Sequence, residues 1–294
     1  MPLFTTIEGV KKHINVSKNL DIKLLMPYKV EALNKIYEFI PQDIFEEIET
    51  THPEIFTSIE RAAANYMVAF SIPFIKIHIS NTGGQNFDDN KLTKADWWDV
   101  RDFGIAAVKI ADKALSKAIN LLLNTTLKSQ LTFLNSKELI ISTPQEFSNI
   151  YEIGSSWDVF KRLIPLMRNS WKIYLSNQLT GCTIEEIKVD EGTNELLKSI
   201  VAYFTIADAI TEPTLLFTNT GIVIQWEELP WQKSQVLDFK NLELLSKKYL
   251  KKANDLLVLL HKELKDNPEK FPCYQFNSTI SHRPTIAKKS GLYL

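Results

Sequence analysis

The sequence is poor in cysteine and in arginine. Cys182 and Cys273 are its only two cysteines, and they lie far apart without forming a CxxC pair. Such sparse usage suits a reducing compartment and leaves a single disulfide between them open. Lysine supplies nearly all of the positive charge, because arginine occurs only as Arg61, Arg101, Arg162, Arg168 and Arg283. That is few arginines for a protein that reads phosphates through bidentate contacts.

Long apolar runs are also missing. The most apolar stretch near the N-terminus, DIKLLMPYKV, is interrupted by Lys23, Pro27 and Lys29. No stretch reaches the length that a membrane-spanning helix needs. The first residues, MPLFTTIEGVKKH, do not contain the apolar core of a signal peptide. These absences predict a soluble protein without a membrane partner.

Motifs of known chemistry are absent as well. Gly83-Gly84 is followed by no Gly-Lys-Ser/Thr, so a turn is favoured there over a phosphate loop. Cys182 has no nucleophile signature around it, and no GxSxG elbow occurs. The histidines form no HExxH or similar pair; they are His13, His52, His78, His261 and His282. The sequence therefore predicts no catalytic, cofactor-binding or metal-binding residue and favours a scaffold over an enzyme.

Two charged clusters remain as alternatives to that interpretation. Asp96, Asp99 and Asp102 lie at three-residue spacing and could form a carboxylate site, although acids also favour the first turns of a helix. A lysine row in LSKKYLKKANDLL could contact nucleic acid or an acidic partner, although most such rows are solvated; it comprises Lys247, Lys248, Lys251 and Lys252.

What remains is the composition of an ordinary globular protein. The 294 residues are 45% hydrophobic and 23% charged, which is enough for one large domain or two smaller ones. The formal net charge of −1 gives no overall reason to expect nucleic-acid binding.

One short turn sequence occurs twice. Asn81-Thr82-Gly83 recurs as Asn219-Thr220-Gly221, 138 positions later. The same spacing pairs residues of one Ala-rich segment, namely Ala64 with Ala202, Val68 with Ile206 and Ala69 with Ala207. At a spacing of 137, Lys35-Ile36-Tyr37 matches Lys172-Ile173-Tyr174. Beyond the turn, a spacing of 135 pairs Leu115 with Leu250 and Ala118 with Ala253. An ordered series of this kind predicts an internal duplication.

Each half has the same predicted order of elements. Apolar residues at three- and four-residue spacing predict helices over 27–40 and 165–179, each opening near a proline, and over 55–71 and 193–210. A period-2 strand over 74–80, an Asn-Thr-Gly turn and a short apolar run predict a β-hairpin, repeated in the second half. Long helices over about 93–124 and 231–264 follow, with Thr93 as the N-cap of the first.

These patterns predict a mainly α-helical protein with small β-hairpins, built of two duplicated modules. The first module spans 1–130 and the second 151–265. Residues 131–150 form a linker in which STPQEF predicts a helix start, and residues 266–294, broken by prolines, are expected to form an extended C-terminal arm.

One part of the chain resembles a known group of proteins. Thr143, Glu146 and Phe147 form a T-x-x-E-F motif, and Ser156 and Phe160 follow as a Ser-x-x-x-F step. With the Ala-rich helix leading into ISNTGG, this run is similar to an uncharacterised family of virion-associated proteins from Bacteroidetes phages and prophages. The resemblance spans most of residues 20–265 and brings no catalytic residues with it.

The resemblance implies a particle component, such as a head–tail neck or connector subunit found in the virion and, during assembly, in the host cytoplasm. Its partners would be further copies in a homo-oligomeric ring, portal or tail proteins, and packaged DNA nearby. Three alternatives stay open: a cap of a contractile injection apparatus, a cytoplasmic binding protein, and an enzyme with a site between the modules. The expected interface residues are Asn81, Thr82, Gly83, Gly84, Asn219, Thr220 and Gly221 at the hairpin tips and Phe271, Tyr274, Phe276, Lys288, Lys289 and Tyr293 in the arm.

Overall fold

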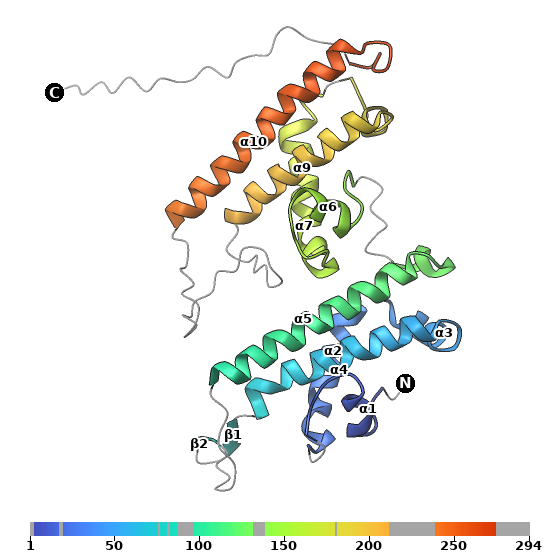
Figure 1. The fold of residues 1–294 in the computed structure, drawn as a ribbon, viewed down its shortest axis with the longest axis vertical. Coiled ribbons are helices and arrows are strands. Elements are labelled where there is room, and N and C mark those ends of the chain that lie inside the picture. The colour runs from blue at the N-terminus through green and yellow to red at the C-terminus, as the bar shows by residue number, and fades with distance from the viewer. Residues whose placement is uncertain are drawn as a thin grey trace, which may run out of the picture.

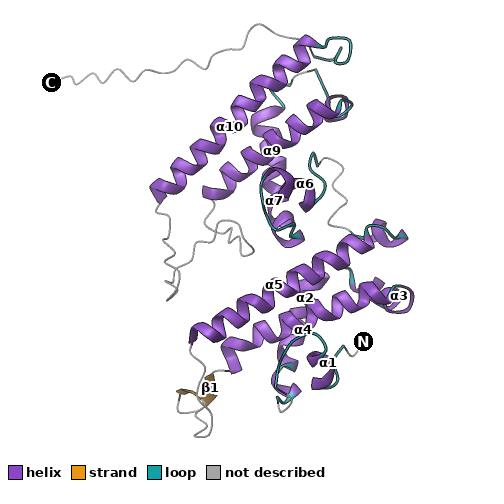
Figure 2. Ribbon diagram, in the orientation of Figure 1, coloured by secondary structure: helices purple, strands orange, loops and turns teal. Residues whose placement is uncertain are grey.

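The computed structural model describes residues 3–17, 20–75, 77–80, 83–86, 97–131, 139–179, 181–211 and 239–274. Over these residues the chain is mainly helical, which confirms the mainly α-helical part of the predicted fold class (Figures 1 and 2). None of the helices in these ranges is long and apolar enough to cross a membrane.

The first half contains two long helices and several short ones. Its elements are α1 (Ile7–Lys11), η1 (Ile22–Leu24), η2 (Met26–Tyr28), α2 (Lys29–Tyr37), η3 (Gln42–Ile44), α3 (Phe45–Thr51), α4 (Pro53–Ile75), β1 (Ile77–Ser80), β2 (Gly83–Asn86), α5 (Trp97–Leu122) and η4 (Thr126–Gln130). The second half comprises α6 (Pro144–Ile150), α7 (Trp157–Ser170), the π-helix η6 (Trp171–Leu175), α8 (Ile184–Ile187), α9 (Glu191–Thr211) and α10 (Phe239–Asp266).

An antiparallel pair of long helices dominates each half. In Figure 1, α4 and α5 lie side by side in the first half, as α9 and α10 do in the second. Small buried side chains, such as Ala62 on α4 and Ala111 and Ala118 on α5, let the two helix axes approach closely. The predicted helices over 55–71 and 193–210 are thereby confirmed as the central parts of α4 and α9.

The segment between α4 and α5 differs in part from the prediction. Phe74 and Ile75, expected in a strand, are the last residues of α4. Strands β1 and β2 pair antiparallel, with Ile77 opposite Asn86 and Ser80 opposite Gly83. The other predicted tip residues, Asn81, Thr82, Asn219, Thr220 and Gly221, lie outside the described residues.

The helix that the sequence predicts to open near Pro165 begins earlier in the structure. Pro165 does not open this helix but lies inside α7, which starts at Trp157. Its continuation, η6, has a π-helical hydrogen bond from the Ser176 N–H to the Trp171 carbonyl, 2.9 Å. A π-turn holds one residue more than an α-turn, so it shifts the helix face that follows.

Burial differs between two residues that the sequence predicts to be equivalent. Ile36 is fully buried, whereas Ile173, its expected match, is 62% exposed. A spacing of 139 instead pairs Ile36 with Leu175, and both side chains are fully buried. The burial of these residues therefore does not follow the predicted match of Lys35-Ile36-Tyr37 with Lys172-Ile173-Tyr174.

The predicted linker 131–150 contains the expected helix start. In α6 the Thr143 side chain accepts from the Glu146 N–H (3.2 Å), and the Glu146 carboxylate accepts from the Thr143 N–H (3.3 Å). Glu146 also accepts from Lys198 Nζ on α9, 2.8 Å away. Burial alone would raise the pKa of Glu146, but these hydrogen bonds outweigh it and lower the pKa. Helix α6 is thereby attached to the second half.

The start of the predicted C-terminal arm is not extended. Helix α10 runs to Asp266, and the following turns place Phe271 in the core, so this residue is not an exposed interface residue. Tyr274 is half-buried, with its hydroxyl 2.7 Å from Nδ1 of His261. The remaining predicted arm residues, Phe276, Lys288, Lys289 and Tyr293, lie outside the described residues.

The two cysteines are paired. Cys182, just before α8, and Cys273, just after α10, form a disulfide with their Cα atoms 4.9 Å apart. The sequence left a single disulfide open as an alternative, and the structure contains it. The cysteines are therefore not the free thiols that suit a reducing compartment. The bond fixes the end of α10 beside the start of the α8–α9 segment.

Candidate functional site: a junction between the halves and a basic groove

The two halves meet where the first turn of α7 rests on α5. Trp157 is 1% exposed, and its indole Nε1–H donates to Asn120 Oδ1, 2.8 Å away. Its backbone N–H donates to Ser116 Oγ at 3.3 Å. A buried indole needs a partner for its N–H, and α5 supplies one. These bonds tie the second half directly to the first.

A set of charges surrounds this tryptophan. Asp158, which is nearly buried, accepts from Lys35 Nζ of the first half at 2.5 Å and from Arg162 at 2.8 Å. Lys161 Nζ donates to the backbone carbonyl and to the carboxylate of Glu38, both at 3.1 Å. A buried carboxylate is tolerated when cations satisfy it, so this arrangement holds the halves in one register.

The sequence between α6 and α7 explains how α7 reaches α5. Gly154 and Ser155 adopt positive φ angles of 69° and 49°, which turn the chain sharply after α6. The Ser155 N–H donates to Ser148 Oγ of α6 at 3.0 Å and fixes this turn. Ser156 then caps α7 by accepting from the Val159 N–H.

Sequence reasoning did not find this junction. Trp157 and Asp158 stand inside the run that carried the family resemblance, but neither was singled out. The available signal was the capping serine followed by a large aromatic and an acid. Their partners Lys35, Ser116 and Asn120 are distant in sequence, so only the fold brings these residues together.

A second arrangement links α4 to α5 inside the first half. The Tyr66 hydroxyl donates to the Asp112 carboxylate, and both side chains are buried. Burial and the neighbouring negative charge of Asp112 raise the pKa of the Tyr66 phenol well above its ordinary value. The phenol therefore stays protonated and serves as a fixed donor between the two helices.

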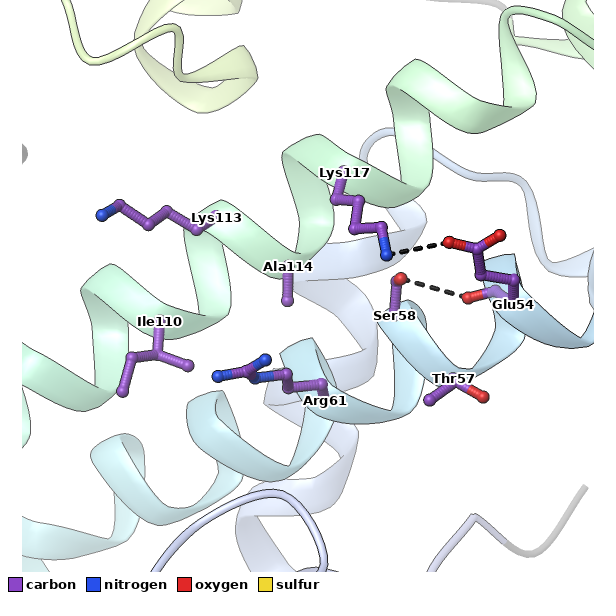
Figure 3. Close-up of a pocket in the computed structure, with 8 residues that line it drawn as sticks. All are labelled: Glu54, Thr57, Ser58, Arg61, Ile110, Lys113, Ala114 and Lys117. Carbon is purple, nitrogen blue, oxygen red and sulfur yellow. Dashed lines mark hydrogen bonds and ion pairs between the residues drawn. The ribbon is translucent and has the colours of Figure 1, made fainter.

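A groove of about 410 Å³ opens between the N-terminal half of α4 and the C-terminal half of α5 (Figure 3). Its lining residues are Glu54, Thr57, Ser58, Arg61, Ile110, Lys113, Ala114 and Lys117. Lys117 pairs with Glu54, with 2.9 Å between Nζ and Oε1. The groove has room because Ser58 and Ala114 present small side chains between the helices.

The chemistry of the groove favours anion binding. The lining contains three cationic side chains and one carboxylate, so its net charge is positive. The Ser58 hydroxyl donates to the Glu54 carbonyl at 3.1 Å, and the Thr57 hydroxyl donates to the Pro53 carbonyl at 2.8 Å. Both hydroxyl protons are thus committed to the helix backbone.

The two charged clusters considered from sequence do not join the groove. Asp99 is exposed at the start of α5, Asp102 accepts from the Arg101 guanidinium at 2.9 Å, and Asp96 lies outside the described residues. Within the lysine row, Lys247 pairs with Glu243 at 2.8 Å. Lys252 donates to the Tyr203 hydroxyl at 2.6 Å. Among the described residues, no three His, Cys, Asp or Glu side chains gather to hold a metal ion.

Comparison with known proteins yields one match. A protein-family model described as a family of unknown function (DUF6712) matches residues 34–131 and 160–284. No curated protein and no solved structure matches the chain. The matched residues include those of the first half that contact α7, namely Lys35, Ser116 and Asn120, and all residues that line the groove. On α7 they include Lys161 and Arg162.

Proposed function

We propose a function for this chain from one premise: it belongs to the family of unknown function DUF6712, whose model matches more than half of its length. The chain is a non-enzymatic structural subunit of a phage or phage-like particle, placed at the head–tail neck or connector. It resides in the virion and, during assembly, in the host cytoplasm. Its partners are further copies of itself and other virion proteins.

The observation that carries this proposal is the repeated burial pattern of the two long central helices. At a spacing of 138, buried residues of α4 fall on buried residues of α9. The pairs are Ile59 and Leu197, Ala62 and Ile200, Ala64 and Ala202, Tyr66 and Phe204, and Val68 and Ile206. A matching core face over this length supports an internal duplication.

The order of elements supports the same duplication. Helices α1 and α6 begin at 7 and 144, α3 and α8 at 45 and 184, and α4 and α9 at 53 and 191. These starts are separated by 137, 139 and 138 positions, respectively. On the last helix of each half, Ala118 of α5 and Ala253 of α10 are both fully buried. Two similar bodies joined through a built interface suit a subunit of an assembly.

The phage setting comes from the resemblance around Thr143–Phe160. The tips of the two predicted hairpins and the C-terminal residues 275–294 are proposed as contacts to neighbouring subunits. A cap of a contractile injection apparatus is the closest alternative, because such a subunit would be built in the same way. Gene neighbours separate the two: portal and terminase genes indicate a phage, and sheath genes without a capsid gene indicate an injection apparatus.

Removal of the gene from the producing phage tests the proposal. A neck subunit predicts filled heads and free tails that do not join, visible by electron microscopy, and rescue by the wild-type gene. Alanine substitutions at Asn81–Gly84 should impair the rescue if the tip is an interface. Infectious, fully joined particles without the gene product would contradict the proposal.

A second candidate, contact with phosphate groups of packaged DNA, is favoured by the groove. Arg61 and Lys113 are exposed beside the Lys117–Glu54 pair. Binding of duplex DNA by purified protein should then weaken steeply with added salt. Arg61→Ala and Lys113→Ala should weaken it further, whereas Lys262→Ala, on an exposed position of α10, should not. Unchanged binding in the groove variants would exclude the groove.

A further inference from the structure

The junction between the halves joins two different surfaces. The second half contributes the first turns of α7, which we call the inserting surface. The first half contributes α5 together with the end of α2, which we call the receiving surface. If the halves are copies, each of them carries both kinds of surface. The chain itself uses only one of each, so one inserting surface and one receiving surface are left over.

The left-over receiving surface lies on α10 and η6. At the spacing of 135 that relates α5 to α10, Ser116 and Asn120 correspond to Lys251 and Asp255, and both of these are exposed. Leu123, which is half-buried, corresponds to Val258, which is 67% exposed. At the spacing of 139 found for η6, Lys35 corresponds to Tyr174, and the neighbouring Ile173 is 62% exposed. We call Ile173, Lys251, Asp255, Val258 and the neighbouring Leu259 the receiving face.

The left-over inserting surface lies at η1. At a spacing of 138, Asp158, Lys161 and Arg162 correspond to Leu20, Lys23 and Leu24. Leu24 is 52% exposed, and Met26 of η2 and Val30 of α2 are 40% and 60% exposed. The position of Trp157 falls on Asn19, outside the described residues. We call Leu20, Lys23, Leu24, Met26 and Val30 the inserting face.

Exposed apolar side chains therefore lie on both of the surfaces that the internal junction leaves open. Contiguous exposed apolar surface in a folded protein commonly marks an interaction site. Lys23 of the inserting face can pair with Asp255 of the receiving face, which also carries Lys251. The internal junction shows that surfaces at these positions can pack against each other.

We propose that a second copy of this chain docks head-to-tail, with its inserting face on the receiving face, and so continues the internal junction between molecules. Such a contact is heterologous, so it closes into a ring or continues as a filament, depending on its rotation. The inference rests on the duplication within the proposed function, but it does not depend on the chain being a phage component.

Mixing two charge variants of the full chain tests this arrangement by sedimentation velocity and native mass spectrometry. Wild-type protein should form oligomers that grow beyond the dimer. Leu24→Glu breaks only the inserting face and Val258→Glu only the receiving face, so each alone should be monomeric. Their mixture retains one intact pair of faces and should form a heterodimer that grows no further. Both sites are exposed, and circular dichroism verifies that each variant keeps its helices.

Val189→Glu is the matched control, because Val189 is 81% exposed and lies outside both faces; it should assemble like the wild type. The inference is overturned if the wild type is monomeric, if either face variant assembles normally, or if the mixture stays monomeric. Loss of assembly in the control would also overturn it. A chain that self-associates but is absent from particles contradicts the proposed function and leaves this inference standing.

Discussion

At the scale of single residues, Trp157 shows how the two halves are joined. Its ring is buried against α5, and its only polar atom on the side chain reaches Asn120. Asp158 beside it is held by Lys35 across the junction. A large aromatic and a satisfied carboxylate at adjacent positions fix both the distance and the register of the contact.

Trp157→Phe should lower the free energy of unfolding by about 1–3 kcal/mol, because it removes the bond to Asn120 and leaves space where the buried indole ring packed. Urea denaturation measures this loss. Asn120→Ala in the Trp157→Phe background should then cost little more, since the shared bond is already gone. Trp171→Phe, at a half-buried position, is the matched control. Additive losses in the double variant would contradict the proposed role of the bond.

The stability of the second half should depend on pH through His261. Burial lowers its pKa from the ordinary value of 6.5, so the unfolded chain takes up a proton at a pH where the folded chain does not. The melting temperature should therefore fall as the pH drops below about 6.5. His261→Gln should flatten this part of the curve. An unchanged slope in that variant would show that another group is responsible.

Among these residues, the sequence could indicate types but not partners. The caps at Thr143 and Ser156 are local, and a short sequence window contains both donor and acceptor. The pairs of Trp157 with Asn120 and of Tyr66 with Asp112 join residues that are far apart, so no spacing rule finds them. The groove depends on two small side chains on different helices and is equally invisible to periodicity.

At the scale of elements, the long helices follow their apolar periodicity, and the irregular parts do not. Helices α4 and α9 were predicted because their apolar faces are continuous. The π-turn η6 was not, because one extra residue in a helix leaves no compositional mark. Phe271 was taken for part of an arm because the prolines near it hide the short turn and the disulfide that return it to the core.

Deletion of Ile173 tests whether η6 holds an inserted residue. The remaining turn should become α-helical, and the core contacts of Leu175 should be kept, so the variant should still unfold cooperatively. Deletion of Thr205, in the middle of α9, is the matched control, because it rotates the rest of a buried helix face by about 100° and should abolish the fold. Thermal unfolding followed by circular dichroism distinguishes the two. A collapsed fold on loss of Ile173 would contradict the insertion.

At the scale of the whole molecule, the described residues form two helical bodies held by a polar and aromatic joint. Each body pairs two long helices through a tight, alanine-rich contact. The joint uses one surface from each body and leaves two apolar faces open at η1 and α10. Under the proposals above, these two faces would join copies of the chain into a larger assembly.

Quantitative mass spectrometry of particles purified from the producing culture tests the central claim most directly. A neck or connector subunit predicts that the polypeptide is present at a fixed copy number per particle, as a closed ring of subunits requires. Its complete absence from every particle fraction, while it is present in the lysate, would contradict the claim.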